Sequence, residues 1–118
     1  MLTIRQDQFR TLSMEMLVAR LRERHPGPSE QRGAEWVREV CRAAVGKAAT
    51  YGISTSDDLL ALAGWMLTIH PHFEYLEDGA WARLILQRPG LTGGEKIRMI
   101  GSQMEHRALA SSLQETVQ

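Results

Sequence analysis

This sequence has little cysteine, no excess of charge of either sign and no long apolar run. Cys41 is the single cysteine among 118 residues, so an internal disulfide is excluded. Fourteen basic residues balance fourteen acidic ones, whereas nucleic-acid-binding proteins usually carry a basic excess or a basic face. The longest strongly apolar stretch, residues 59–69, is much shorter than the roughly 20 residues that a transmembrane helix needs. These shortages predict a protein that binds neither nucleic acid nor membrane.

The beginning of the chain also lacks the form of a signal peptide. Arg5 and Asp7 place charge where such a peptide has its apolar segment. Cys41 follows Val40 in a helical pattern, where a small buried thiol is the simplest interpretation. We therefore expect the protein to reside in the reducing cytoplasm.

The bulk composition is that of an ordinary globular domain. Hydrophobic residues make up 43% of the chain and charged residues 24%, which is typical of folded proteins. A chain of this length can bury a core without disulfides or metals. We predict one domain over residues 1–118, with a frayed polar tail from residue 111 to residue 118.

A tight corner between two helices is the clearest local signal. Gly52 can adopt the left-handed conformation that ends a helix, and Ile53 can fold back over that end. Thr55 or Ser54 can cap the next helix, and Asp58 adds negative charge to its first turn.

The same signals recur along the chain and predict an all-α bundle of about five helices. Pro26 is expected to stop the first helix, Ser29 to cap the second and Asp78 to cap the fourth, while Thr92 and Glu95 form a capping box for the fifth. The first four predicted helices cover residues 5–24, 29–52, 55–70 and 79–88. The third is apolar on nearly every side, so we expect it to lie at the centre.

Two finer predictions concern packing. Gly33 and Gly46 each weaken the second helix by about 1 kcal/mol relative to alanine, which suggests close packing there. The short fourth helix is predicted to turn Trp81, Leu84 and Ile85 inward.

Three residue sets could carry chemistry, and each has a simpler explanation. His70 and His72 with Glu74 could share a metal ion, but a closed site needs further ligands. Paired carboxylates at Asp57 and Asp58 are accounted for by the dipole of the helix that they begin. The stretch 92–96 lacks the glycine spacing of a phosphate loop. No catalytic residue, metal ligand or cofactor is therefore assigned.

Aromatic residues make up only 6% of the chain, so each large aromatic side chain is considered for a role in the core or at an interface. Core packing is the default for all three tryptophans, but an exposed tryptophan beside apolar neighbours is a typical anchor of a protein interface. We predict Trp65, Phe73, Tyr75 and Trp81 as the partner-binding residues. Arginines near the end of the first helix could form a charged rim, although they also complement its dipole; they are Arg20, Arg22 and Arg24.

Several motifs follow one another from Tyr51 to Met99: Tyr51-Gly52-Ile53, an apolar helix, His70-Pro71-His72-Phe73, Trp81-Ala82-Arg83-Leu84-Ile85-Leu86 and a charged final helix. In this order of motifs the chain resembles a group of small, mostly uncharacterised bacterial proteins encoded with type VI secretion effectors. The resemblance implies an accessory protein that binds another protein, as an effector chaperone, a loading adaptor or an immunity factor. It implies no catalytic residues, because the matching positions form corners and core.

The sequence thus favours a non-enzymatic protein-binding factor, with a homodimer through the same surface as a close variant. Two alternatives stay open. A helix-turn-helix DNA-binding regulator would use the corner at Gly52, although the following helix lacks basic residues. A small metal-dependent enzyme would use His70 and His72.

Overall fold

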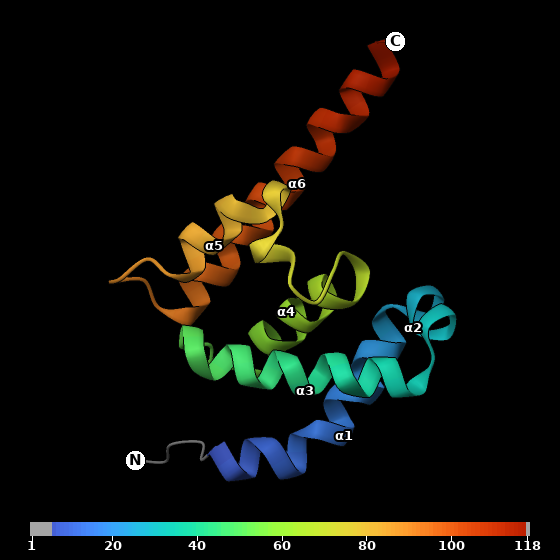
Figure 1. Ribbon diagram of the computed structural model, residues 1–118, viewed down its shortest axis with the longest axis vertical. Coiled ribbons are helices and arrows are strands. Elements are labelled where there is room, and N and C mark those ends of the chain that lie inside the picture. The colour runs from blue at the N-terminus through green and yellow to red at the C-terminus, as the bar shows by residue number, and fades with distance from the viewer. Residues whose placement is uncertain (1–5, 118) are drawn as a thin grey trace.

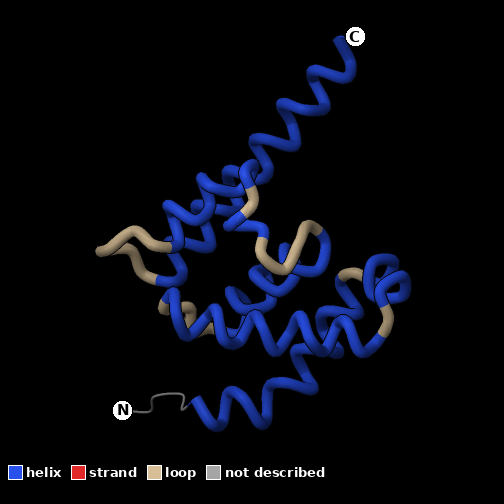
Figure 2. Tube along the Cα trace, in the orientation of Figure 1, coloured by secondary structure: helices blue, strands red, loops and turns tan. Residues whose placement is uncertain are grey.

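Six α-helices and two short 3-10 turns, η1 and η2, make up the described chain (Figure 1). The computed structural model describes the backbone of residues 6–117 and the side chains of residues 14–108. The elements are α1 (Gln6–Arg24), α2 (Pro26–Arg32), α3 (Ala34–Tyr51), α4 (Ser56–Thr68), η1 (Phe73–Tyr75), η2 (Glu77–Gly79), α5 (Ala80–Leu86) and α6 (Gly93–Val117). No strand occurs within residues 6–117 (Figure 2), so the all-α prediction is confirmed.

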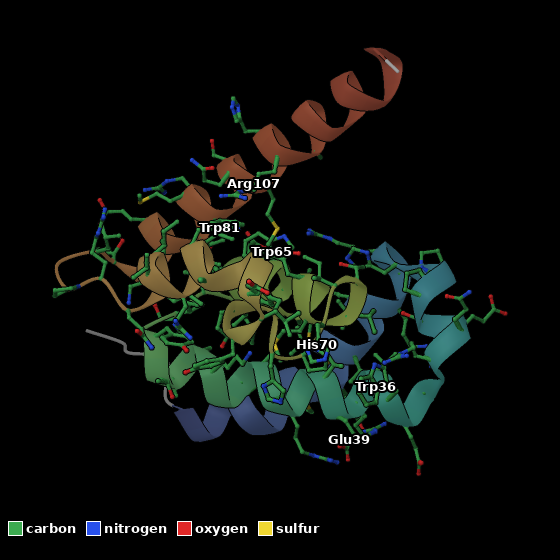
Figure 3. All side chains as sticks on the ribbon, turned by 45° about the horizontal axis from the view of Figure 1, so that its top comes forward. Trp36, Glu39, Trp65, His70, Trp81 and Arg107 are labelled. Atoms are coloured by element: carbon green, nitrogen blue, oxygen red, sulfur yellow. The ribbon has the colours of Figure 1, made fainter. Side chains whose placement is uncertain are left out.

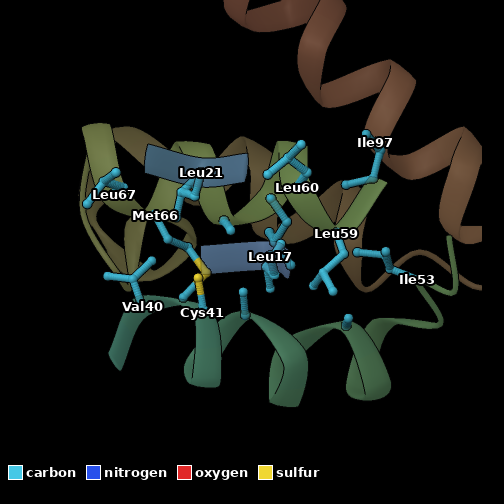
Figure 4. Close-up of a cluster of buried hydrophobic side chains, with 14 of the residues drawn as sticks. Leu17, Leu21, Val40, Cys41, Ile53, Leu59, Leu60, Met66, Leu67 and Ile97 are labelled. Carbon is cyan, nitrogen blue, oxygen red and sulfur yellow. The ribbon is translucent and has the colours of Figure 1, made fainter. Parts of the chain in front are cut away.

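Helix α4 lies at the centre of the core, as its sequence predicts. It packs against α3, α1 and α6, and its buried residues are Leu59, Leu60, Leu62, Ala63, Gly64, Met66 and Leu67. Figure 4 shows Leu17 and Leu21 of α1 and Cys41 of α3 meeting this helix from its other sides. Because α4 contributes apolar side chains all round, burial rather than amphipathic patterning stabilises it.

The corner between α3 and α4 has the predicted geometry. Gly52 has a φ of 76° in the left-handed region, and the Ile53 N–H donates to the Ala48 carbonyl oxygen at 2.8 Å. Ile53 is thereby folded back into the core. Thr55 caps α4, since its Oγ1 accepts the Asp58 N–H at 3.2 Å.

The segment after α1 differs from its prediction. Pro26 does end α1, but it also begins a helix of its own, because proline is well suited to the first helical position. Ser29, predicted as a cap, lies inside α2 and is buried. Gly33 separates α2 from α3 with a φ of 94°. A methyl group at Gly33 or at Gly46 would meet nothing within 4 Å, so the prediction of close packing at these glycines is wrong.

Helix α5 also differs from its prediction, both in where it starts and in which of its residues are buried. It follows η2 directly, with Gly79 rather than Asp78 at the cap position and no side-chain cap. Its fully buried residues are Ala82 and Leu86. Of the residues predicted to face inward, Trp81 and Ile85 are partly buried against the core, whereas Leu84 is 66% exposed. The residues of α5 are apolar at nearly every position, so contacts with η1 and α6 select the buried face.

Helix α6 begins at the predicted capping box. The Thr92 N–H donates to Glu95 Oε1 at 2.8 Å, and the Glu95 N–H donates to Thr92 Oγ1 at 3.1 Å. Ile97 and Ile100 pack into the core. The helix then extends away from the other helices (Figure 1) and continues to Val117, so residues 111–117, predicted as a frayed tail, are helical. No helix in residues 6–117 is both long and apolar enough to cross a membrane.

Candidate functional site

Two of the predicted anchors, Trp65 and Trp81, lie against α6. Gly101, Met104 and Arg107 follow one another at three-residue steps and therefore lie along one side of that helix. A side chain at Gly101 would meet the Trp65 ring at 3.7 Å, and the Arg107 guanidinium stacks 4.5 Å from the centre of the Trp81 ring. Figure 3 shows the two tryptophans and Arg107 gathered at the junction of α4, α5 and α6.

We call this surface the tryptophan face. Leu84 extends it along α5, because it lies three residues after Trp81. The two tryptophans and Met104 are each half-buried. The tryptophan face is defined by Trp65, Trp81, Leu84, Met104 and Arg107.

Phe73, the third predicted anchor, belongs to the core instead. Its side chain is only 3% exposed, and its ring meets that of Trp65 edge to face, with centroids 6.2 Å apart and an angle of 76°. The Lys47 ammonium lies 5.6 Å from the centre of the Phe73 ring. The prediction that Phe73 forms part of an exposed surface is therefore wrong. It supports Trp65 through an edge-to-face contact of a kind worth about 1 kcal/mol.

Tyr75 is exposed, but it lies apart from the tryptophan face. Its side chain is 56% exposed, and the Arg83 guanidinium stacks 5.3 Å from its ring centre. Arg83 and Trp81 are two positions apart on α5 and so point to different sides of the helix. The four predicted anchors therefore separate into an α6-facing pair, one core residue and one exposed residue on another surface.

A buried polar cluster joins α3 to the segment after α4. The Lys47 ammonium donates to Glu74 Oε1 at 2.6 Å and to the Pro71 carbonyl oxygen at 2.5 Å. The Tyr51 hydroxyl donates to Glu74 Oε2 at 3.3 Å. Glu74 is fully buried, so both of its oxygens are satisfied by protein donors. The Lys96 ammonium extends the cluster by donating to the Tyr51 carbonyl oxygen at 2.9 Å.

This cluster keeps the Tyr51 hydroxyl protonated. Burial raises the pKa of Tyr51 well above its ordinary value, and the Tyr75 hydroxyl and the negative charge of Glu74 raise it further. Burial likewise raises the pKa of the Cys41 thiol to about 11, so that the reactive thiolate is disfavoured at neutral pH. Both groups are suited to holding the fold and unsuited to proton transfer or nucleophilic attack near pH 7.

The histidine pair of the metal hypothesis lies on the surface beside Trp36. The His70 and His72 ring centres are 6.0 Å apart, and the His72 N–H donates to His70 Nδ1 at 2.9 Å. Glu74 is directed to Lys47 instead. Among the side chains at positions 14–108, no three His, Cys, Asp or Glu residues are grouped so as to hold a metal ion.

The histidines also line a cleft of about 320 Å³ with Arg32, Trp36 and Pro71. The Arg32 guanidinium stacks 4.5 Å from the centre of the Trp36 ring. Trp36 lies well away from Trp65 and Trp81 in Figure 3. The cleft is therefore a separate feature from the tryptophan face.

Sequence reasoning did not identify Lys47 and Lys96. Their partners lie 27 and 45 positions away, and a local pattern carries no information about such pairings. One weak signal was present, since Lys47 is four residues before Tyr51 and so shares its side of α3. A lysine on the buried side of a helix indicates a buried acceptor, but does not say which one.

A scan of the chain against protein-family models finds no match, and searches of the curated proteins and of the solved structures find none either.

Proposed function

We propose that this chain is a non-enzymatic protein-binding factor that docks its partner on the tryptophan face. Trp65 and Trp81 are large, half-buried aromatics held in place by α6, and Leu84 beside them is 66% exposed. Fixed aromatic side chains next to exposed apolar ones are characteristic of the residues that dominate binding energy in protein interfaces. This juxtaposition is the observation that carries the proposal.

The state of the ionisable groups supports a non-enzymatic role. Glu74 is neutralised by Lys47, and the raised pKa values of Tyr51 and Cys41 keep both residues protonated. Arg107 adds a cation at the edge of the tryptophan face, where it can accelerate association with an acidic partner. The resemblance of residues 51–99 to accessory proteins of type VI secretion suggests that the partner is a secreted bacterial effector, with this chain as its chaperone, adaptor or immunity protein.

The helix-turn-helix alternative is less well supported. The helix after the Gly52 corner is α4, and seven of its residues are buried in the core. A recognition helix needs an exposed polar face that can enter the DNA groove.

The test is calorimetric titration of the purified chain with the product of a neighbouring effector gene. Trp81→Ala should weaken binding at least tenfold, which is the effect of removing an interface anchor worth about 1.4 kcal/mol. Trp36→Ala is the matched control, because Trp36 is also half-buried beneath an arginine at 4.5 Å but lies on another surface. Binding that weakens equally in both variants, or in neither, contradicts the proposed surface.

Co-expression distinguishes the accessory roles. Rescue of cells from the toxicity of the effector supports the immunity role, whereas increased soluble effector without rescue supports the chaperone or adaptor role. Light scattering of the chain alone, with Trp81→Ala beside it, tests the homodimer variant. A dimer lost in Trp81→Ala would assign the tryptophan face to self-association.

A further inference from the structure

An open pocket of about 390 Å³ lies where α3 ends, α5 ends and α6 begins. The loop between α5 and α6, which projects at one side in Figure 1, forms one of its walls. Polar and apolar side chains share its lining, with Thr50, Tyr75 and Gln87 among the polar ones, and Lys96 and Arg88 supply positive charge. The lining residues used below are Tyr51, Arg88, Pro89, Leu91 and Lys96.

Lys96 has no counter-ion among the side chains of residues 14–108. Its side chain is only 8% exposed, and its ammonium donates one hydrogen bond, to the Tyr51 carbonyl oxygen. Among the described side chains, no carboxylate lies within 4 Å of this ammonium. Glu95, its neighbour in sequence, is hydrogen-bonded to the Thr92 backbone instead. An ammonium group has three donors, so Lys96 retains donors for a further acceptor.

The charges of the polar cluster do not cancel. Lys47 and Lys96 bring two positive charges and Glu74 one negative charge, and Lys47 already neutralises Glu74. The carbonyl end of α3 offsets part of the charge of Lys96, because a helix C-terminus carries about half a negative charge. The remaining positive charge on Lys96 is a buried charge beside a pocket. Burying a charge is costly unless it is paired.

We propose that this pocket binds a carboxylate ligand, with its oxygens on the Lys96 ammonium and the Arg88 guanidinium. A carboxylate has two oxygens, which can accept from the ammonium and from the guanidinium. Arg88 stands at the rim, where a guanidinium can hold a carboxylate through two parallel hydrogen bonds. Pro89 and Leu91 offer accessible apolar surface to the rest of the ligand, which would be unfavourable for a doubly charged phosphate. The ligand is either a small free acid or the terminal carboxylate of a peptide.

The experiment is a titration followed by backbone amide NMR at constant ionic strength. The probes are isovalerate, inorganic phosphate, and acetyl-Leu-Leu as its free acid and as its amide. We expect saturable shifts of the Lys96, Gly90 and Tyr51 amides with carboxylates, and weaker binding of phosphate. Tighter binding of the peptide acid than of isovalerate assigns the site to a chain terminus, and the reverse order assigns it to a small free acid.

Two variants separate a binding site from general charge screening. Arg88→Gln should weaken carboxylate binding about tenfold, the effect of losing a charge-assisted pair. Arg98→Gln removes the same charge from an exposed position on α6 that does not line the pocket, and it should leave the affinity within about twofold. Lys96→Met should abolish binding. If Lys96→Met does not fold, the comparison of Arg88→Gln with Arg98→Gln still tests the proposal.

Three outcomes overturn the proposal. The wild-type amides do not shift saturably with any carboxylate, in which case Lys96 only caps α3. Phosphate binds more tightly than isovalerate and the peptide acid. Arg88→Gln and Arg98→Gln weaken binding equally, which is the behaviour of nonspecific screening.

Discussion

Lys47 of α3 and Glu74 of η1 form a buried ion pair in which the ammonium and carboxylate lie 2.6 Å apart. Lys47 is mostly buried and Glu74 completely so. The same ammonium holds the Pro71 carbonyl oxygen at 2.5 Å, so one side chain fixes the whole turn that follows α4. That turn presents Phe73 to Trp65, which links the ion pair to the tryptophan face.

Removing one partner of this pair should destabilise the fold strongly. Lys47→Met leaves the fully buried Glu74 carboxylate unpaired, and we expect it to lower the free energy of unfolding by roughly 3–5 kcal/mol. The double variant Lys47→Met/Glu74→Gln carries no buried charge at this place and should be more stable than Lys47→Met alone. Urea unfolding at pH 7 measures both effects.

An exposed ion pair supplies the control for this prediction. Glu39 and Arg42 lie 3.6 Å apart with side chains 68% and 61% exposed. Glu39→Gln should therefore change stability by less than about 0.5 kcal/mol. If the changes in unfolding free energy caused by Glu74→Gln and by Lys47→Met add up to the change in the double variant, the two side chains are not coupled. The role assigned to the pair is then incorrect.

The glycine inside α3 and the glycine at its C-cap should respond to alanine in opposite directions. Gly52→Ala places a side chain at a φ of 76° and should cost about 1–2 kcal/mol. Gly46→Ala lies inside α3, where an added methyl meets nothing within 4 Å, and should stabilise by about 0.5–1 kcal/mol. Thermal and urea unfolding of the two variants provide the measurement. A stabilising Gly52→Ala would contradict the left-handed conformation at the corner.

The features predicted correctly from the sequence depend on neighbours in the chain. The corner at Gly52 and the capping box at Thr92 each close within a few residues, so composition and spacing suffice to locate them. The central place of α4 follows from apolar residues on nearly every side of it.

The features missed depend on distant partners. The predicted inner face of α5 is wrong at Leu84, because Trp81, Ala82, Leu84, Ile85 and Leu86 are all apolar and only the docking of η1 and α6 selects among them. The prediction of Phe73 as an exposed anchor beside Tyr75 is wrong for the same reason. In the 3-10 turn η1 these neighbours in one short segment reach different environments, which helical spacing does not anticipate.

The capping box of α6 should make a measurable contribution. Thr92→Ala removes the Oγ1 acceptor of the Glu95 N–H and should cost about 1 kcal/mol. The hydrogen bonds from Thr92 hold the pKa of Glu95 below its ordinary value. Glu95 therefore contributes stability when the pH is above the ordinary pKa of a glutamate. This contribution is lost as the pH falls through the lowered pKa of Glu95 in the folded chain.

The pH series gives this prediction a second readout. Thr92→Ala keeps the backbone N–H of residue 92, the larger cause of the lowered pKa of Glu95, and loses the smaller contribution of the threonine side chain. Wild type should therefore lose slightly more stability than Thr92→Ala as the pH falls from 6 to 3. Urea midpoints for the two proteins over that range provide the comparison. Parallel pH profiles would contradict a contribution of the threonine side chain to the lowered pKa of Glu95.

Alkaline pH should destabilise the protein through Cys41. Its pKa is raised by burial from 9.0 to about 11, so the unfolded chain releases the thiol proton at lower pH than the folded chain does. The stabilising contribution is complete below pH 9 and is lost as the pH rises towards 11, by an amount on the order of 2–3 kcal/mol. Tyr51, whose pKa is also raised, should add to the loss above pH 10.

A variant isolates the thiol from the other groups that titrate in this range. Cys41→Ala lowers stability at pH 7 by leaving a small cavity in the core, but its stability should fall less steeply than that of wild type between pH 9 and pH 10. Urea unfolding of both proteins at pH 7, 9, 10 and 10.5 provides the slopes. Equal slopes in the two proteins would mean that the Cys41 thiol titrates alike in the folded and unfolded chains, which is incompatible with its complete burial between α3 and α4.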